Sequence, residues 1–263
     1  MNILERIIEK KVEEVAWRKK HHPLEYLRDQ PGFQRPIFSL AASLQDERLT
    51  GIIAEFKRKS PSKGIINGEA LVEDVTRAYA GNGASALSVL TDKEFFGGST
   101  ADLEAARFNQ LPILRKDFII DEYQLVESRS MGADVILLIA ACLSPQRVKE
   151  LAEAATELGL EVLLELHAEE ELEHVNAFTP IVGINNRDLK TFTVDIERSI
   201  RMADSLPAST TKVAESGIDK VENVCRFQAH GFKGFLIGEQ FMKAADPALA
   251  FQQFAIALRK LSV

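Results

Sequence analysis

The sequence has few cysteines and no long apolar segment, and both shortages narrow the classes of protein it can encode. Its two cysteines, Cys142 and Cys225, lie far apart and outside any CxxC or Cys/His ligand spacing, so we expect reduced thiols and no metal site. The longest apolar run, 135–143, is far shorter than the ~20 residues of a membrane-spanning helix. The N-terminal stretch MNILERIIEKKVEEV is an amphipathic helix pattern without a signal-peptide core. We therefore expect a cytoplasmic protein with no membrane partner.

The sequence also lacks nucleotide-binding motifs and a strong charge of either sign. No GxGxxG or Walker motif follows the first predicted strand, which weighs against a dinucleotide or nucleoside triphosphate site. A formal net charge of -7 indicates solubility rather than a surface for nucleic acid, so we expect no nucleic-acid partner. The length of 263 residues, 46% of them hydrophobic, suits one α/β barrel, since such barrels typically have about 250 residues.

Short runs rich in Val, Ile and Leu recur along the chain, each followed by a polar break and then a helical pattern. Helical spacing is clear over 71–80, 144–159 and 168–178. The runs are continuously apolar, as parallel strands buried on both faces should be. The predicted strands are 52–56, 86–90, 112–116, 134–140, 161–166, 180–184, 212–216 and 234–238.

Eight such units predict a closed (β/α)8 TIM barrel rather than an open doubly wound sheet. We expect residues 1–263 to form a single domain. Residues 1–48 precede the barrel as an N-terminal helical extension, with helices over 3–20 and around 39–46. Apolar positions of the first helix, such as Val12 and Trp17, are expected to be buried, and the extension should cap or flank the mouth of the barrel.

Charged side chains follow several of the predicted strands, and the active site of a TIM barrel lies at these carboxyl-terminal ends. Because strand side chains alternate, Glu55 and Lys57 share one face and point into the mouth if Ile53 faces the barrel interior. The same count places Lys116 and Glu165 there. The clustered residues are Glu55, Lys57, Lys116, Glu165, Asn185, Arg187 and Glu215.

Three other cations, Arg58, Lys59 and Arg115, are out of phase with this face and are predicted to be structural or rim charges. Since neighbouring lysines repel and burial disfavours charge, at least one of the mouth lysines should have a depressed pKa and exchange a proton near neutrality. His167 follows a strand closely, but without partner residues we interpret it as a rim residue.

Two glycine-containing junctions, Ser216-Gly217 and Gly238-Glu239, each join the end of one of the last two predicted strands to a helical start. Glycine allows close approach of a ligand, helix N-termini favour anions, and TIM barrels often bind phosphate in these loops. We therefore predict a phosphate site there.

Phe95, Phe96 and Phe118 follow the second and third strands in polar surroundings, which favours an apolar pocket for an aromatic ring.

Long stretches of the chain resemble one enzyme family, indole-3-glycerol phosphate synthase. They are IIAEFKRKSPSKG, LTDKEFFGGS, ILRKDFIIDEYQ, VLLELHAEEEL, VGINNRDLKTFTVD, VAESGI and FLIGEQFM. The resemblance covers every predicted strand, and because the chain ends after the eighth helix we expect the monofunctional form. It implies conversion of an aromatic amino sugar phosphate, 1-(2-carboxyphenylamino)-1-deoxyribulose 5-phosphate, to indole-3-glycerol phosphate with loss of carbon dioxide and water, in tryptophan biosynthesis. No cofactor is implied, since the chemistry needs only acid–base groups and positioning.

The resemblance also implies roles for individual residues. Lys116 resembles the general acid that protonates the ketone, and Lys57 the lysine that holds the substrate carboxylate and assists dehydration. Glu165 resembles the acid/base carboxylate, and Glu55 the group that orients the lysines. The expected substrate-binding residues are Asn185, Arg187, Glu215, Ser60, Phe96 and Phe118. The expected phosphate-binding residues are Ser216, Gly217, Gly238 and Glu239.

The residues alone leave two other functions open. A strand lysine could attack a carbonyl, as in a Schiff-base aldolase. A phosphate-binding barrel without catalytic activity is disfavoured by the paired lysines and carboxylates. We expect a monomer, with a weak homodimer as the alternative.

Overall fold

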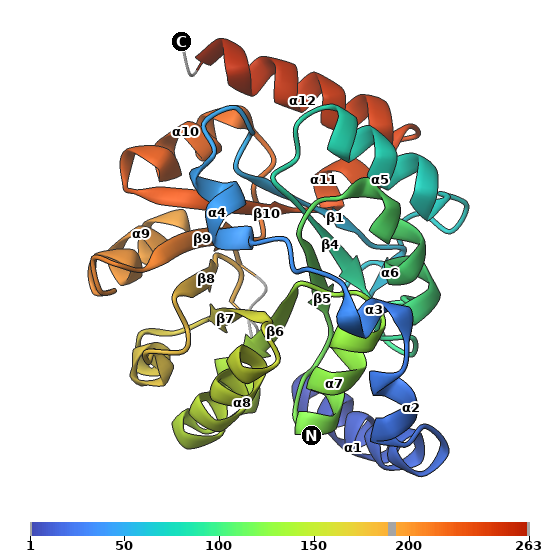
Figure 1. Ribbon diagram of the computed structural model, residues 1–263. Coiled ribbons are helices and arrows are strands. Elements are labelled where there is room, and N and C mark those ends of the chain that lie inside the picture. The colour runs from blue at the N-terminus through green and yellow to red at the C-terminus, as the bar shows by residue number, and fades with distance from the viewer. Residues whose placement is uncertain (1, 189–192, 262–263) are drawn as a thin grey trace.

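The computed structural model describes residues 2–188 and 193–261, and it is a closed barrel of parallel strands surrounded by helices (Figure 1). Neighbouring strands follow the chain order, and the last strand pairs with the first. The barrel strands are β1 (Ile52–Phe56), β4 (Ala86–Leu90), β5 (Ile113–Lys116), β6 (Val135–Ile139), β7 (Glu161–Leu166), β8 (Ile181–Asn185), β9 (Thr211–Glu215) and β10 (Phe232–Ile237). The predicted TIM barrel is confirmed, with each predicted strand in place. Residues 189–192 of the VGINNRDLKTFTVD stretch lie outside the described residues.

The helices that follow the strands bury one face against the sheet, and α12 lies beside α5 on the outside of the barrel (Figure 1). These helices are α5 (Val72–Gly81), α6 (Thr100–Ala106), α7 (Glu122–Ser130), α8 (Pro145–Glu157), α9 (Ile196–Asp204), α10 (Val221–Ala229), α11 (Glu239–Met242) and α12 (Pro247–Leu261). Short 3-10 turns are η1 (Arg107–Asn109), η2 (Ala140–Cys142) and η3 (Glu169–His174). No helix in the described part of the chain is long and apolar enough to cross a membrane.

One predicted helix, over 168–178, is wrong. The segment forms only the short turn η3. Its acidic residues repel at helical spacing, since Glu169 and Glu173 would be four residues apart on one face. The hairpin of β2 (Lys59–Ser60) and β3 (Gly64–Ile65), after β1, was not predicted because its strands are too short to show a period.

The extension forms α1 (Ile3–His21), α2 (Leu24–Arg28), α3 (Pro31–Gln34) and α4 (Leu40–Gln45). Helix α1 reaches the mouth, where Ile7 packs with the barrel interior. Helix α4 lies instead at the amino-terminal ends of the strands, because Ser39 Oγ donates to Glu161 Oε1 at the start of β7. The expectation that the whole extension flanks the mouth is therefore wrong for α4.

Alternation along the strands separates two apolar clusters. Ile53, Leu114 and Leu163 lie together inside the barrel, while Phe56 packs in the layer between sheet and helices. Glu55 lies two residues beyond Ile53 on the same face of β1, so its side chain points toward the mouth of the barrel. Val12 and Trp17 are 55% and 56% exposed, so the expectation of their burial is wrong. Helix α1 packs against the rest of the protein through one face only, and Val12 and Trp17 lie outside that face.

Candidate active site

The ends of β5, β7 and β9 are joined by one lysine. Lys116 Nζ lies 2.6 Å from Glu165 Oε2 and 3.1 Å from Glu215 Oε2. Both carboxylates are almost fully buried, at 4% and 1% exposure. Parallel strands bring these residues together because their carboxyl ends meet at the same rim.

The charges in this cluster determine its proton affinities. Burial disfavours the charge of Lys116, but the carboxylates, above all Glu165 and Glu215, outweigh burial and raise its pKa above the ordinary value. The prediction of a depressed pKa is therefore wrong for Lys116, because each lysine is paired with carboxylates rather than with the other lysine. Burial alone would raise the pKa of Glu165, yet Lys116 and His167 lower it well below its usual range. Burial, together with repulsion by Glu165, raises the pKa of Glu215 to about 7.

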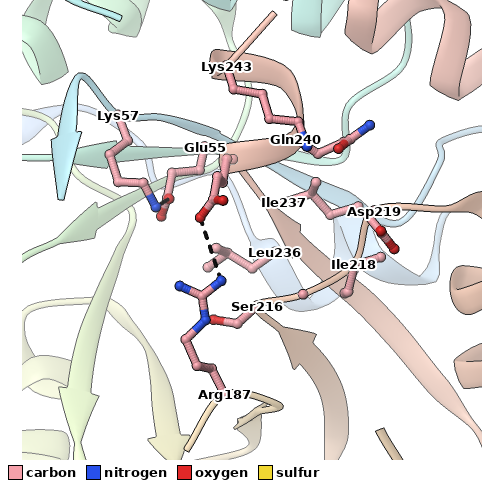
Figure 2. Close-up of a pocket in the computed structure, with 13 residues that line it drawn as sticks. Glu55, Lys57, Arg187, Ser216, Ile218, Asp219, Leu236, Ile237, Gln240 and Lys243 are labelled. Carbon is pink, nitrogen blue, oxygen red and sulfur yellow. Dashed lines mark ion pairs between the residues drawn. The ribbon is translucent and has the colours of Figure 1, made fainter. Parts of the chain in front are cut away.

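A second ion pair lies at the end of β1, where Lys57 Nζ is 2.6 Å from Glu55 Oε1. The other oxygen of Glu55 lies 3.5 Å from Ser88 Oγ on β4. Glu55 is thus fixed between a neighbouring strand and Lys57, which turns the ammonium toward the cavity (Figure 2).

Asn185 and His167 both contact Glu165. Asn185 Nδ2 donates to Glu165 Oε1 at 2.9 Å, and His167 Nε2 lies 2.9 Å from the same oxygen. His167 is only 7% exposed and lines the cavity, so the interpretation as a rim residue is wrong. Burial lowers and the charge of Glu165 raises the pKa of His167, with a net increase. Its position two residues beyond Glu165 on the same face was the available signal.

Gly183 in β8 was not singled out from the sequence, but the site depends on its lack of a side chain. A β-carbon there would collide with Oε1 of Glu215. A glycine inside a strand often marks such a close approach, which is the signal that the run PIVGI offered.

A cavity of about 420 Å³ opens above these residues. Phe96 and Phe118 line it with ring centroids 6.0 Å apart, and α1 contributes Ile3, Leu4 and Ile7. Phe95 does not line this cavity; it packs against the barrel-interior cluster, so its predicted place in the ring pocket is wrong. Ser60, the last residue of β2 in the β2–β3 hairpin, also lines the cavity.

A smaller cavity of about 120 Å³ adjoins the first, since Glu55, Lys57, Arg187, Ser216 and Glu239 line both. Figure 2 shows its labelled cations, Lys57, Arg187 and Lys243, around the same space. The Arg187 guanidinium lies 3.6 Å from a Glu239 carboxylate oxygen. Apart from Phe95, every sequence-predicted site residue lines one or both cavities. The sequence analysis missed Lys243, because it falls in a helix end rather than beside a strand.

The two glycine junctions differ from each other. Ser216 and Gly217 have consecutive positive φ values of 66° and 68°, and α10 begins only at Val221. Gly238 leads directly into the four-residue helix α11, and a β-carbon on it would lie 2.6 Å from Glu55 Oε1. The prediction that both junctions run straight into helices is thus correct for Gly238 only. Left-handed Ser216 is a strained position, of the kind that occurs at ligand sites.

The out-of-phase cations make structural contacts. Arg115 is fully buried and bonds to Asp117 and Glu127, while Arg58 pairs with Asp102. Lys59 Nζ donates to the Glu94 carbonyl. Among the described residues, no group of three His, Cys, Asp or Glu side chains could hold a metal ion.

The sequence matches the family model described as indole-3-glycerol phosphate synthase over residues 4–254. The indole-3-glycerol phosphate synthase of Bacteroides thetaiotaomicron is 49% identical over 264 residues, covering 98% of this chain and 99% of that protein. The enzyme of that name from Acinetobacter baumannii (strain ATCC 17978) is 44% identical over 252 residues, covering 95% and 94%.

More distant structures share the fold alone. The tryptophan synthase alpha subunit of Legionella pneumophila superposes with a TM-score of 0.61 at 12% identity, covering 86% of this chain and 98% of that one. The 3-hexulose-6-phosphate synthase of Salmonella typhimurium also superposes with a TM-score of 0.61 at 12% identity, covering 80% and 98%.

Proposed function

The chain belongs to the indole-3-glycerol phosphate synthase family and is a carboxy-lyase of tryptophan biosynthesis, and we propose that Lys116, Lys57 and Glu165 carry out its ring closure. The substrate is 1-(2-carboxyphenylamino)-1-deoxyribulose 5-phosphate. Ring closure joins the aromatic carbon bearing the carboxylate to the ketone carbon, and carbon dioxide and water then leave.

The observation that carries this proposal is the pairing of Lys116 with two buried carboxylates. This environment raises the pKa of Lys116 and keeps an ammonium in the cavity at neutral pH. An ammonium donates a proton to the ketone oxygen as the ring carbon attacks, whereas a Schiff-base nucleophile needs a lysine with a depressed pKa. The geometry therefore favours acid catalysis over imine formation.

Lys57 is placed to serve the later steps. Its ammonium pairs with Glu55 and borders both cavities, where it would hold the substrate carboxylate and then assist departure of the hydroxyl as water. Loss of carbon dioxide restores the aromaticity of the benzene ring, and Glu165, held ionised by Lys116 and His167, would accept the proton that leaves the methylene carbon beside the nitrogen as water is lost. Asn185 and Glu215 would contact the sugar hydroxyls and the anilino nitrogen, close to Glu165.

The two ends of the substrate match the two cavities. The apolar walls of Phe96, Phe118 and α1 suit the anthranilate ring. The smaller cavity suits the phosphate, with Ser216, Gly217, Gly238 and Glu239 at its wall and Arg187 and Lys243 as cations. The Glu239 carboxylate would turn toward Arg187 and away from the anion, while Ser60 would close the side of the site.

We further propose that the enzyme acts in the cytoplasm and as a monomer; a weak homodimer is the alternative that sedimentation would reveal. The function is tested by incubation with the substrate while indole fluorescence is followed. A rise in indole fluorescence with release of one carbon dioxide per substrate is expected. Absence of both would reject the proposal.

A further inference from the structure

We propose that Lys11 of helix α1 is a positioning residue for the aromatic half of the substrate, because its ammonium holds the two aspartates that fix the backbone at Phe96 and Phe118. Lys11 does not line the cavity and would not touch the substrate. The inference deepens the proposed function and rests on it, since it assigns the pocket of these two rings to the substrate's anthranilate group.

Lys11 is buried to an extent that is unusual for a lysine on an amphipathic surface helix, with 2% exposure. Its Nζ lies 2.8 Å from Asp117 Oδ1, 3.0 Å from Asp92 Oδ2 and 2.8 Å from Glu14 Oε2. A buried lysine is stable only when carboxylates compensate its charge. Here two of the three come from the barrel, more than eighty residues away along the chain.

The two aspartates hold the loops that carry the aromatic rings. Asp92 Oδ1 accepts hydrogen bonds from the backbone N–H groups of Phe95 at 2.8 Å and Phe96 at 3.3 Å. Asp117 Oδ1 accepts from the backbone N–H of Phe118 at 2.8 Å. Each carboxylate thus contacts Lys11 and a loop backbone at once, and the ammonium sets the separation of the two loops.

The ion pairs around Lys11 close into a ring of alternating sign that joins α1, α7 and β5. Its members are, in order, Lys11, Glu14, Arg18, Glu127, Arg115 and Asp117. Burial disfavours the charge of Lys11, but Asp117 and Asp92 raise its pKa overall, and Lys11 with Arg115 lowers the pKa of Asp117. Lys11, Arg115 and Asp117 therefore stay charged across the neutral range.

Helix α1 also forms part of the pocket wall through Ile3, Leu4 and Ile7. Lys11 lies one turn beyond Ile7, so the same contact that orders the loops also sets how closely α1 approaches the rings. The structure thereby explains why a helix outside the barrel contributes to the substrate cavity.

The ammonium of Lys116 contacts no member of this ring, although its backbone lies between Arg115 and Asp117. Its side chain bonds instead to Glu165 and Glu215. Loss of Lys11 should therefore weaken binding of the ring more than the chemical step. Loss of binding that is shared by ground state and transition state raises KM and leaves kcat nearly unchanged.

The test compares Lys11→Met with Lys10→Met, a matched control on the same helix that is 49% exposed and pairs with Glu13. KM, kcat and inhibition by inorganic phosphate are measured for each variant with the substrate. We expect KM to rise about tenfold or more in Lys11→Met with kcat changed less than about threefold. The phosphate inhibition constant should be unchanged, and Lys10→Met should match the wild type.

Asp92→Asn keeps the shape of the side chain and removes its charge, so it serves if Lys11→Met does not fold. It should also raise KM selectively. In the double variant Lys11→Met/Asp92→Asn, the rise in KM should be smaller than the two single effects combined, since both substitutions remove the same contact. Equal loss of phosphate and substrate binding, a fall in kcat alone, or wild-type kinetics of Asp92→Asn would overturn the proposal. Wild-type protein without turnover would reject the proposed function instead, and fluorescence-monitored binding of 2-aminobenzoate would still compare the variants.

Discussion

The carboxylate of Glu215 occupies space that is open only because residue 183 is glycine. A β-carbon on Gly183 would collide with Glu215 Oε1, and the opposite oxygen of that carboxylate lies 3.1 Å from Lys116 Nζ. The position of one carboxylate on β9 is thus determined by the missing side chain on β8. The closed barrel leaves little room for relaxation, because Val182 and Ile184 on either side are fully buried.

Gly183→Ala should displace Glu215 and lower kcat on the order of 10²-fold, since small misplacements of reacting groups have effects of this size. Gly81→Ala is a matched control, because Gly81 ends helix α5 and a β-carbon there meets nothing within 4 Å. It should keep full activity and gain a few tenths of a kcal/mol of stability, up to ~1 kcal/mol. Steady-state kinetics and thermal unfolding of both variants check this, and an active Gly183→Ala enzyme would contradict it.

Lys116→Met and Glu165→Gln should each lower kcat by about 10²–10⁴-fold, because a positioned acid or base contributes a factor of this order. Both side chains line the cavity at the mouth and lie outside the apolar core of the barrel, so circular dichroism should still show a folded protein. Lys233→Met is the control, since this lysine is an exposed strand residue on β10, far from the mouth. Near-normal kcat in either site variant would remove that residue from the mechanism.

Glu215 and Glu165 should have opposite effects on the pH dependence of stability. The pKa of Glu215 is raised from 4.5 to about 7, so the folded state holds a proton that the unfolded state has released between these pH values. The stability of the wild type therefore falls as pH rises through this window, because the folded protein must release the proton of Glu215. Glu215→Gln should become more stable than the wild type as pH rises from 5 to 8, by at most about 3 kcal/mol.

Glu165 provides the control of opposite sign. Its pKa is lowered, so its ionised form stabilises the folded protein above the ordinary carboxyl pKa, and this contribution is lost as pH falls through the folded value. Glu165→Gln should therefore be less stable than the wild type at pH 8. Urea unfolding measures the two slopes, for Glu215→Gln between pH 5 and pH 8 and for Glu165→Gln below pH 5, where the unfolded and then the folded carboxylate takes up its proton. Slopes of the same sign would show that the cluster is not charged as described.

Borohydride added during turnover should leave the enzyme active and its intact mass unchanged. The raised pKa of Lys116 keeps it as an ammonium, which cannot attack the substrate ketone. Imine formation would be trapped as an irreversible adduct. Mass spectrometry that located a substrate-sized adduct on Lys116 or Lys57 would support aldolase-type chemistry instead.

A phosphate or sulfate ion in a crystal should bind between Ser216-Gly217 and Gly238-Glu239, in the cavity that Lys57, Arg187 and Lys243 line. The cations and the close approach of two glycine-containing loops favour an anion there. Arg187→Met should weaken competitive inhibition by phosphate several-fold. Reproducible anion density elsewhere, with this cavity empty in phosphate, would count against the assignment.

The sequence by itself determined the barrel and the face of the site. Continuous apolar runs of five or six residues identify buried parallel strands, and the period of two then separates Glu55 and Lys57 from Phe56. These are local properties, since they depend on the order of neighbouring residues only. The charged residues of the mouth could therefore be named before the structure was known.

Tertiary structure alone decided which charges meet. Lys116 pairs with Glu165 and Glu215, 49 and 99 residues away, so its pKa is raised and not depressed. Lys11 looks like a solvent-exposed helix residue in the sequence, yet Asp92 and Asp117 make its burial possible. Pairing, burial and the resulting proton affinities depend on distances across the closed barrel, and no local pattern in the chain encodes those distances.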